Sequence, residues 1–142
     1  IRTMPMLPEY ELLVVGSGRY RGELERIADE TGVADRVLFF GYVDDEQLPQ
    51  LYAGADVYVT MSEFEAYGMT VAEALAAGTP CVVRQDNALN DWTTIDSCFG
   101  LSDPTSRELA DAIIEACALN PAPASLPQWD DVVKQLLERY QR

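Results

Sequence analysis

The sequence predicts an α/β fold in three layers, with helices covering both faces of a parallel sheet. Short apolar stretches alternate with helical stretches along the chain, which is the order that parallel sheets require. The stretches 11–15 and 81–84 are apolar without alternation, as expected for strands that are buried on both faces. The segment 56–84 reads as strand, loop, helix and strand, and the crossover in such a unit is right-handed.

Each element has its own sequence signals. Helices are expected to end at Gly32 and Gly78, because glycine favours C-terminal caps. Asp44 or Asp45 is expected to cap a helix that tolerates Pro49 in its first turn. The predicted strands are 11–15, 35–43 with its exit loop, 56–61, 81–84 and 98–101, and the predicted helices are 21–31, 45–55, the stretch between Gly68 and Gly78, 106–119 and 129–140. The leading segment 1–10, the polar stretch 85–95 and the proline-rich stretch 120–127 are expected to be loops or linkers.

The composition indicates one globular domain, expected to comprise residues 1–142. Hydrophobic residues make up 48% of the 142 residues, which is enough for one core. The net charge is −14, from 24 acidic and 10 basic residues, and it argues against nucleic acid and anionic membrane surfaces as partners. No apolar stretch approaches the length of a bilayer span, so no transmembrane segment is expected.

The balance of charged residues also suggests a halophilic protein. Lys134 is the single lysine, and arginine supplies the other basic residues. An acidic, lysine-poor surface suits high salt, which screens the repulsion between the acidic side chains. An ordinary acidic bacterial protein is the alternative explanation.

Three cysteines and the lack of histidine restrict the possible chemistry. Cys81, Cys98 and Cys117 are widely spaced in apolar stretches, which predicts buried thiols in a reducing cytoplasm. Without histidine, Ser-His-Asp triads, histidine bases and histidine metal sites are excluded, and the cysteines lack zinc spacing. Carboxylates, arginines, backbone amides and the substrate itself must therefore supply the chemistry, and no metal site is expected.

The stretch around Gly68 carries the clearest functional signal. The predicted helix offers the backbone amides of Gly68, Met69 and Thr70 to an anion, and the glycine permits close approach. Glu65 precedes this helix start and Glu73 lies about a turn and a half into it, so both carboxylates can accept hydrogen bonds from hydroxyls. A nucleoside diphosphate sugar has this layout. Retaining glycosidases place two carboxyls about 5 Å apart, which fits poorly, since eight positions along a helix span about 12 Å.

The spacing of these residues resembles a known family. Residues 62–83 fill the frame Ser-x-x-Glu-x-x-Gly-x-x-x-x-Glu-Ala-x-Ala-x-Gly-x-Pro-x-Val, with seven residues between the two glutamates. This resembles the E-x7-E region of retaining GT-B glycosyltransferases of the family 4 type, whose C-terminal half is a Rossmann-like domain that binds the donor. The resemblance implies that Glu65 is the catalytic-site residue on the donor sugar ring, that Glu73 holds the ribose hydroxyls, and that the amides near Gly68 hold the distal phosphate. The family usually has a Gly-Phe-Gly-like triplet where this chain has Ala66-Tyr67-Gly68.

Two further stretches receive expected roles from the same resemblance. The turn Gly16-Ser17-Gly18 follows a predicted strand and would face the diphosphate and sugar, with a simple tight loop as the alternative. Tyr42 and Val43 end a segment similar to the family's DRV-x-F-x-G-x-V and would lie on the base side, with a glycine-capped strand end as the alternative. A dinucleotide site is disfavoured, because Gly-x-Gly-x-x-x-Gly is one residue off the fingerprint and the ribose-binding acid is missing.

The resemblance covers about residues 9–140 and implies a glycosyltransferase. It implies that the chain is a nucleotide-sugar-binding domain. In the family, this domain opens with one more strand and helix, which carry an Arg and a Lys for the diphosphate and which this chain would lack. The N-terminal acceptor domain of the family would be missing as well. The intact enzyme would transfer a glycosyl group with retention from a nucleoside diphosphate sugar to a hydroxyl of an acceptor sugar, lipid or protein. The leaving phosphate would take the proton, with no metal or cofactor.

The expected location is the cytoplasm, with peripheral membrane attachment through the other half as a variant, and the fragment alone is expected to be inactive. The alternatives are a nucleotide-sugar epimerase of GT-B-like fold and a non-catalytic nucleotide-binding module.

Overall fold

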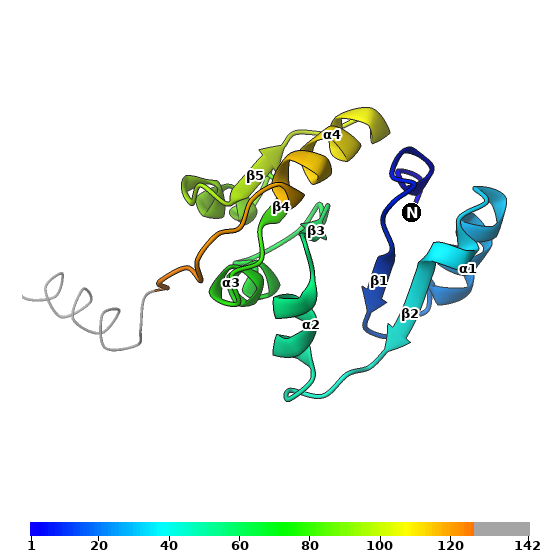
Figure 1. Cartoon of the computed structure of the whole chain (residues 1–142), viewed down its shortest axis with the longest axis horizontal. Coiled ribbons are helices and arrows are strands. Elements are labelled where there is room, and N and C mark those ends of the chain that lie inside the picture. The colour runs from blue at the N-terminus through cyan, green and yellow to red at the C-terminus, as the bar shows by residue number, and fades with distance from the viewer. Residues whose placement is uncertain (127–142) are drawn as a thin grey trace, which may run out of the picture.

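The computed structural model describes residues 1–126 and confirms the α/β class (Figure 1). Every pair of neighbouring strands is parallel. The strands are β1 (Leu12–Val15), β2 (Val37–Gly41), β3 (Tyr58–Thr60), β4 (Cys81–Arg84) and β5 (Cys98–Leu101), the α-helices are α1 (Arg21–Glu30), α2 (Leu48–Gly54), α3 (Met69–Ala76) and α4 (Ser106–Cys117), and the short 3-10 helices are η1 (Met4–Met6), η2 (Ala34–Arg36) and η3 (Ala88–Thr94). The predicted helix 129–140 lies outside the described residues.

The parallel strands form two sheets instead of the predicted single sheet. β1 pairs with β2, and β3, β4 and β5 form the second sheet in that order. Figure 1 shows α1 beside the first sheet, and α3 and α4 beside the second. Within residues 1–126 no ladder of hydrogen bonds joins β1 to β3, so each of these strands has one edge without a strand partner.

The face of the first sheet opposite α1 is partly exposed in the described chain. The guanidinium of Arg21 in α1 lies over the Phe39 ring, 5.4 Å from its centroid, which places α1 on the Phe39 face. The opposite face carries four large apolar side chains that are 39–49% exposed: Leu13, Val15, Leu38 and Phe40. This face therefore remains partly accessible to solvent.

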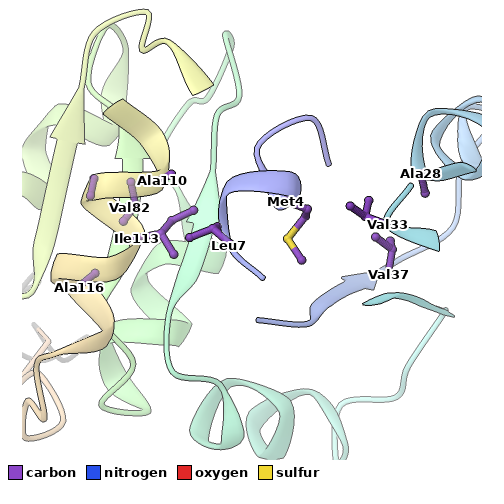
Figure 2. Close-up of a cluster of buried hydrophobic side chains, with 10 residues drawn as sticks. Met4, Leu7, Ala28, Val33, Val37, Val82, Ala110, Ile113 and Ala116 are labelled. Carbon is purple, nitrogen blue, oxygen red and sulfur yellow. The ribbon is translucent and has the colours of Figure 1, made fainter. Parts of the chain in front are cut away.

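The N-terminal segment connects the two sheets through the core. Met4 and Leu7 are buried in one cluster with Val37 of β2, Val82 of β4 and Ile113 of α4. Figure 2 shows Leu7 beside Ile113, and Met4 between Leu7 and Val33. The predicted leading loop is therefore a packed part of the fold.

A hydrogen-bonded arginine holds this segment in place. The Arg36 guanidinium donates to the carbonyl oxygens of Leu7 at 2.7 Å, Tyr10 at 2.9 Å and Met4 at 3.2 Å. Because these three carbonyls come from one segment, Arg36 ties residues 4–10 to the start of β2.

A second core cluster lies beneath α3. The helix buries Val71, Ala72, Ala74 and Leu75, and these side chains pack with Cys81 and Val83 of β4 and with Leu89 and Trp92 of η3. Gly78 follows the helix with φ +85°, which confirms the predicted glycine cap. The described part of the predicted linker, up to residue 126, packs here as well, because the Ala124 amide donates to the Leu75 carbonyl at 2.8 Å.

Several elements differ from the predictions in their bounds or type. The second helix starts at Leu48, because Asp44 caps the preceding turn by accepting hydrogen bonds from the amides of Glu46 and Gln47. The last described helix starts at Ser106 as predicted, after a capping box between Thr105 and Glu108, and ends at Cys117 instead of residue 119. The polar stretch 85–95, predicted as a loop, contains η3.

Candidate functional site

The site is built around the left-handed backbone of Gly68. Gly68 precedes α3 with φ 89° and ψ 51°. A Cβ at this position would lie 2.5 Å from Leu89 Cδ2 and 3.1 Å from Trp92 Nε1. Both the backbone angle and the space therefore require glycine here, which fixes how the first turn of α3 meets the preceding loop.

The 3-10 helix η3 supports this loop from behind. Trp92 Nε1 donates to the Tyr67 carbonyl at 2.6 Å, and the two rings meet edge to face with centroids 5.3 Å apart. Asn87 Nδ2 donates to the Ser62 carbonyl at 2.7 Å, and Asn87 Oδ1 accepts from the Leu89 amide. Sequence reasoning missed this support, although Asn87 is a good capping residue and Leu89 and Trp92 have helical spacing.

The Glu65 carboxylate turns back onto its own loop. Its Oε1 atom accepts hydrogen bonds from the amides of Ala66 at 3.2 Å and Gly68 at 3.3 Å. One of the three amides expected to hold a phosphate is therefore engaged by Glu65. The Met69 and Thr70 amides stand in the first turn of α3, and within residues 1–126 neither donates a hydrogen bond.

The Glu73 carboxylate is exposed, but a tyrosine of another helix contacts it. The Tyr52 hydroxyl, from α2, donates to Glu73 Oε2 at 3.1 Å. Burial, followed by the Glu73 charge, raises the Tyr52 pKa well above its ordinary value. Beside it, the Tyr58 hydroxyl donates to Thr70 Oγ1 at 2.8 Å. The two tyrosines thus each reach one predicted site residue of α3.

The other predicted site residues lie at the ends of the first sheet. Gly16 follows β1 with φ +114°, and its amide donates to the Gly41 carbonyl at 2.7 Å. This hydrogen bond brings the Gly16-Ser17-Gly18 turn next to Tyr42 and Val43, which follow β2. The Tyr42 side chain is 81% exposed. Within the described chain no hydrogen bond or ion pair joins this group to Glu65, Gly68 or Glu73, so the structure places the predicted site residues in two groups.

Arg84 is the basic residue at the carboxyl end of β4, and acidic side chains surround it. Its guanidinium lies 3.3 Å from Asp86 and 3.8 Å from each of Glu63 and Asp103. Sequence reasoning assigned no role to Arg84. The pattern that could have indicated one is a single basic residue at the end of a strand, between acidic residues in the sequence. The contact between Arg84 and Glu63 links the end of β4 to the loop that carries Glu65.

A pocket of about 200 Å³ lies on the η3 side of the same loop. Its lining residues are Ala66, Tyr67, Ala88, Asp91 and Trp92. Among residues 1–126 no group of side chains is arranged to hold a metal ion. In the same part of the chain, every helix is too short or too polar to cross a bilayer.

Comparison with known proteins gives a consistent result. Residues 1–127 match the family described as "Glycosyl transferases group 1". An uncharacterized glycosyltransferase of Methanocaldococcus jannaschii is 31% identical over 99% of this chain and 40% of its own length. Sucrose-phosphate synthase of Thermosynechococcus elongatus matches with a TM-score of 0.75 and 26% identity, over 98% of this chain and 40% of that structure.

A second solved structure contains a nucleotide. HepE of Anabaena, crystallised in complex with UDP, matches with a TM-score of 0.69 and 27% identity, over 76% of this chain and 31% of that structure. The chain thus spans well under half the length of these relatives. With its parallel strands, helices and family match, it belongs to the glycosyl transferases group 1 family, which is the family 4 type of GT-B glycosyltransferase.

Proposed function

We propose that this chain binds the nucleoside diphosphate part of a sugar donor for retaining glycosyl transfer to an acceptor hydroxyl. The start of α3 carries this proposal, because the exposed residues Met69 and Thr70, whose amides donate no hydrogen bond within residues 1–126, lie in the sequence between Glu65 and Glu73. Amides at a helix start suit a phosphate, and carboxylates suit hydroxyls. The relative HepE, which has been crystallised with UDP, supports the same ligand class.

The residues of the α3 site take different roles in this proposal. Met69 and Thr70 bind the distal phosphate, while Glu73 accepts hydrogen bonds from the ribose. Glu65 leaves the Gly68 amide and orients the sugar ring. As the glycosidic bond lengthens, charge builds on the diphosphate, and amides already directed at that charge stabilise it. The leaving phosphate then takes the proton of the acceptor hydroxyl.

The residues after β1 and β2 complete the proposed donor site. The Gly16-Ser17-Gly18 turn faces the diphosphate and sugar, and Tyr42 with Val43 lies against the base. In the enzyme as a whole, an N-terminal domain binds the acceptor sugar, lipid or protein. These parts of the proposal depend on the family resemblance and on the position of both turns at the carboxyl ends of parallel strands.

Calorimetry tests the proposal directly. The chain is titrated in molar KCl with UDP, GDP and ADP, and the titration is repeated with Glu73→Ala. We expect one nucleotide to bind and the variant to lose at least about tenfold in affinity, since a hydrogen bond to a charged group contributes about 1.5–3 kcal/mol. The matched control is Glu115→Ala, which removes an exposed carboxylate from α4 and leaves the affinity unchanged. Equal binding by wild type and Glu73→Ala would contradict the proposed ribose contact.

A further inference from the structure

The contact between Tyr52 and Glu73 joins two helices that are far apart in the sequence. We infer that Tyr52 is a positioning residue, which holds the Glu73 carboxylate in the orientation that reads the ribose hydroxyls of the donor. The inference rests on the proposed function and deepens it, because it names what makes the site selective for a ribonucleotide. Tyr52 does not itself touch the ligand in this arrangement.

The structure fixes Tyr52 more firmly than the carboxylate that it contacts. Its side chain is 8% exposed, whereas Glu73 belongs to the exposed residues of α3. The Tyr52 carbonyl accepts hydrogen bonds from the Thr79 hydroxyl at 2.6 Å and from the Ala55 amide at 3.0 Å. Thr79 is itself 2% exposed, so this anchor lies inside the protein.

The Tyr52 ring is held from the side as well. It meets the Tyr58 ring edge to face, with centroids 5.6 Å apart and an angle of 77° between the planes. Edge-to-face pairs are the favoured arrangement of neighbouring aromatic rings. The ring therefore has little freedom, and its hydroxyl reaches Glu73 from a defined direction.

The chemistry of the contact suits orientation of a hydroxyl-binding group. A carboxylate only accepts hydrogen bonds, so the phenol must donate to Oε2. With Oε2 held, rotation of the carboxylate is restricted and Oε1 remains available for a second donor. A ribose offers two adjacent hydroxyl donors, and each can approach a carboxylate that has a fixed plane. A freely rotating glutamate would lose conformational entropy on binding, and preorganisation by Tyr52 removes that cost.

The experiment compares ribonucleotides with analogues that lack the ribose hydroxyls. The affinity of the full chain for UDP, or for GDP or ADP if one of these binds more tightly, is divided by its affinity for the 2′,3′-dideoxy analogue. Tyr52→Phe removes the hydroxyl and keeps the ring. We expect it to lower this ratio about threefold to tenfold, the fold-change of one hydrogen bond. Tyr58→Phe is the matched control, since its hydroxyl contacts Thr70 instead, and it should keep the wild-type ratio.

A purely structural role would not change the ratio, because loss of folding weakens both nucleotides equally. In the Glu73→Ala background, Tyr52→Phe should have no further effect on it. The inference is overturned if Tyr52→Phe keeps the wild-type ratio, if Tyr58→Phe lowers it equally, or if the effect persists without Glu73. Wild type that binds no nucleotide, or binds both forms equally, would instead overturn the proposed function and this inference with it.

A measurement on the wild-type chain covers the case in which Tyr52→Phe fails to fold. The phenolic proton of a tyrosine that donates to a carboxylate gives its own NMR signal when exchange is slow. We expect the Tyr52 signal to shift when UDP binds and to stay in place with the dideoxy analogue. An equal response to both nucleotides would overturn the inference.

Discussion

The Glu65 carboxylate accepts a hydrogen bond from the Gly68 amide, over a distance of 3.3 Å. The loop thus binds one of its own anionic groups at a position where a phosphate oxygen is expected. In the proposed function, an incoming diphosphate would compete with Glu65 for this amide, and the displaced carboxylate would then become available for the sugar. In this proposal, one backbone N–H couples the binding of the diphosphate to the contact between Glu65 and the sugar.

Removal of this carboxylate should strengthen the binding of a nucleoside diphosphate that carries no sugar. Glu65→Ala frees the Gly68 amide and removes a negative charge near the ligand. Exposed charge interactions contribute about 0.2–1 kcal/mol, so we expect up to about fivefold tighter binding of UDP by calorimetry. Weaker binding of UDP to Glu65→Ala than to wild type would contradict the competition.

Gly68→Ala should destabilise the fold strongly. The left-handed backbone costs a non-glycine residue about 1–2 kcal/mol, and the new Cβ would lie 2.5 Å from Leu89 Cδ2, which adds about 1–3 kcal/mol of overpacking. Urea unfolding in constant molar KCl measures the change in the free energy of unfolding.

The matched control for this substitution is Gly22→Ala. Gly22 lies in α1 with an ordinary helical backbone, and a Cβ added there would meet no neighbouring side chain within 4 Å. Alanine should stabilise α1 by about 0.5–1 kcal/mol. A similar effect of both substitutions would show that Gly68 is not constrained as described.

Trp92→Phe should loosen the loop that carries Glu65. The variant loses the hydrogen bond from Nε1 to the Tyr67 carbonyl, which contributes about 0.5–1.5 kcal/mol. We expect a lower free energy of unfolding and faster hydrogen exchange at the Gly68 amide. Unchanged exchange at Gly68 would mean that η3 does not support the loop.

The stability of the chain should fall at alkaline pH. Burial raises the pKa of the Cys98 thiol to about 11, and burial also raises the pKa values of Cys81 and Tyr52. A group with a raised pKa in the folded state stabilises the fold below its unfolded pKa, and this contribution is lost as pH rises through the folded pKa. We therefore expect the free energy of unfolding to be constant up to about pH 9 and to decrease between about pH 9 and 11. Cys98→Ala should make this decrease shallower, and an identical pH profile for the variant would contradict the assignment.

Salt should stabilise the fold if the acidic composition reflects a halophilic protein. The net charge of −14 causes repulsion that molar salt screens. We expect the thermal midpoint measured by circular dichroism to rise with KCl concentration. An equally well-folded chain in low and in molar salt would contradict the halophilic prediction.

The sequence predicted the elements that local signals define. The strands Cys81–Arg84 and Cys98–Leu101 have the predicted bounds, because each is a short, largely apolar run, the first directly after a proline and the second between two serines. The Gly78 cap follows from the same local chemistry. The α3 site could be proposed because Glu65, Gly68 and Glu73 lie close together in the chain.

The features that sequence reasoning missed depend on contacts between distant segments. The division into two sheets depends on which strands pair, and no local pattern encodes that pairing. The 3-10 helix η3 lies in a polar stretch, and its apolar residues become meaningful only once they pack under Gly68. The Tyr52 contact was missed because Tyr52 and Glu73 are 21 positions apart in the sequence, and the tyrosine hydroxyl meets the carboxylate only through the tertiary fold.

Four strand edges have no strand partner within residues 1–126, those of β1, β2, β3 and β5, and they bear on solubility. Such edges, together with the partly exposed side chains of Leu13, Val15, Leu38 and Phe40, are surfaces on which other copies of the chain can pair and aggregate. In dilute buffer the net charge of −14 keeps the copies apart. At about 1 M salt the screening length falls to about 3 Å, and this long-range protection is lost. The same salt that should stabilise each folded molecule will therefore lower its colloidal stability, and the two effects set an optimum salt concentration for handling the chain.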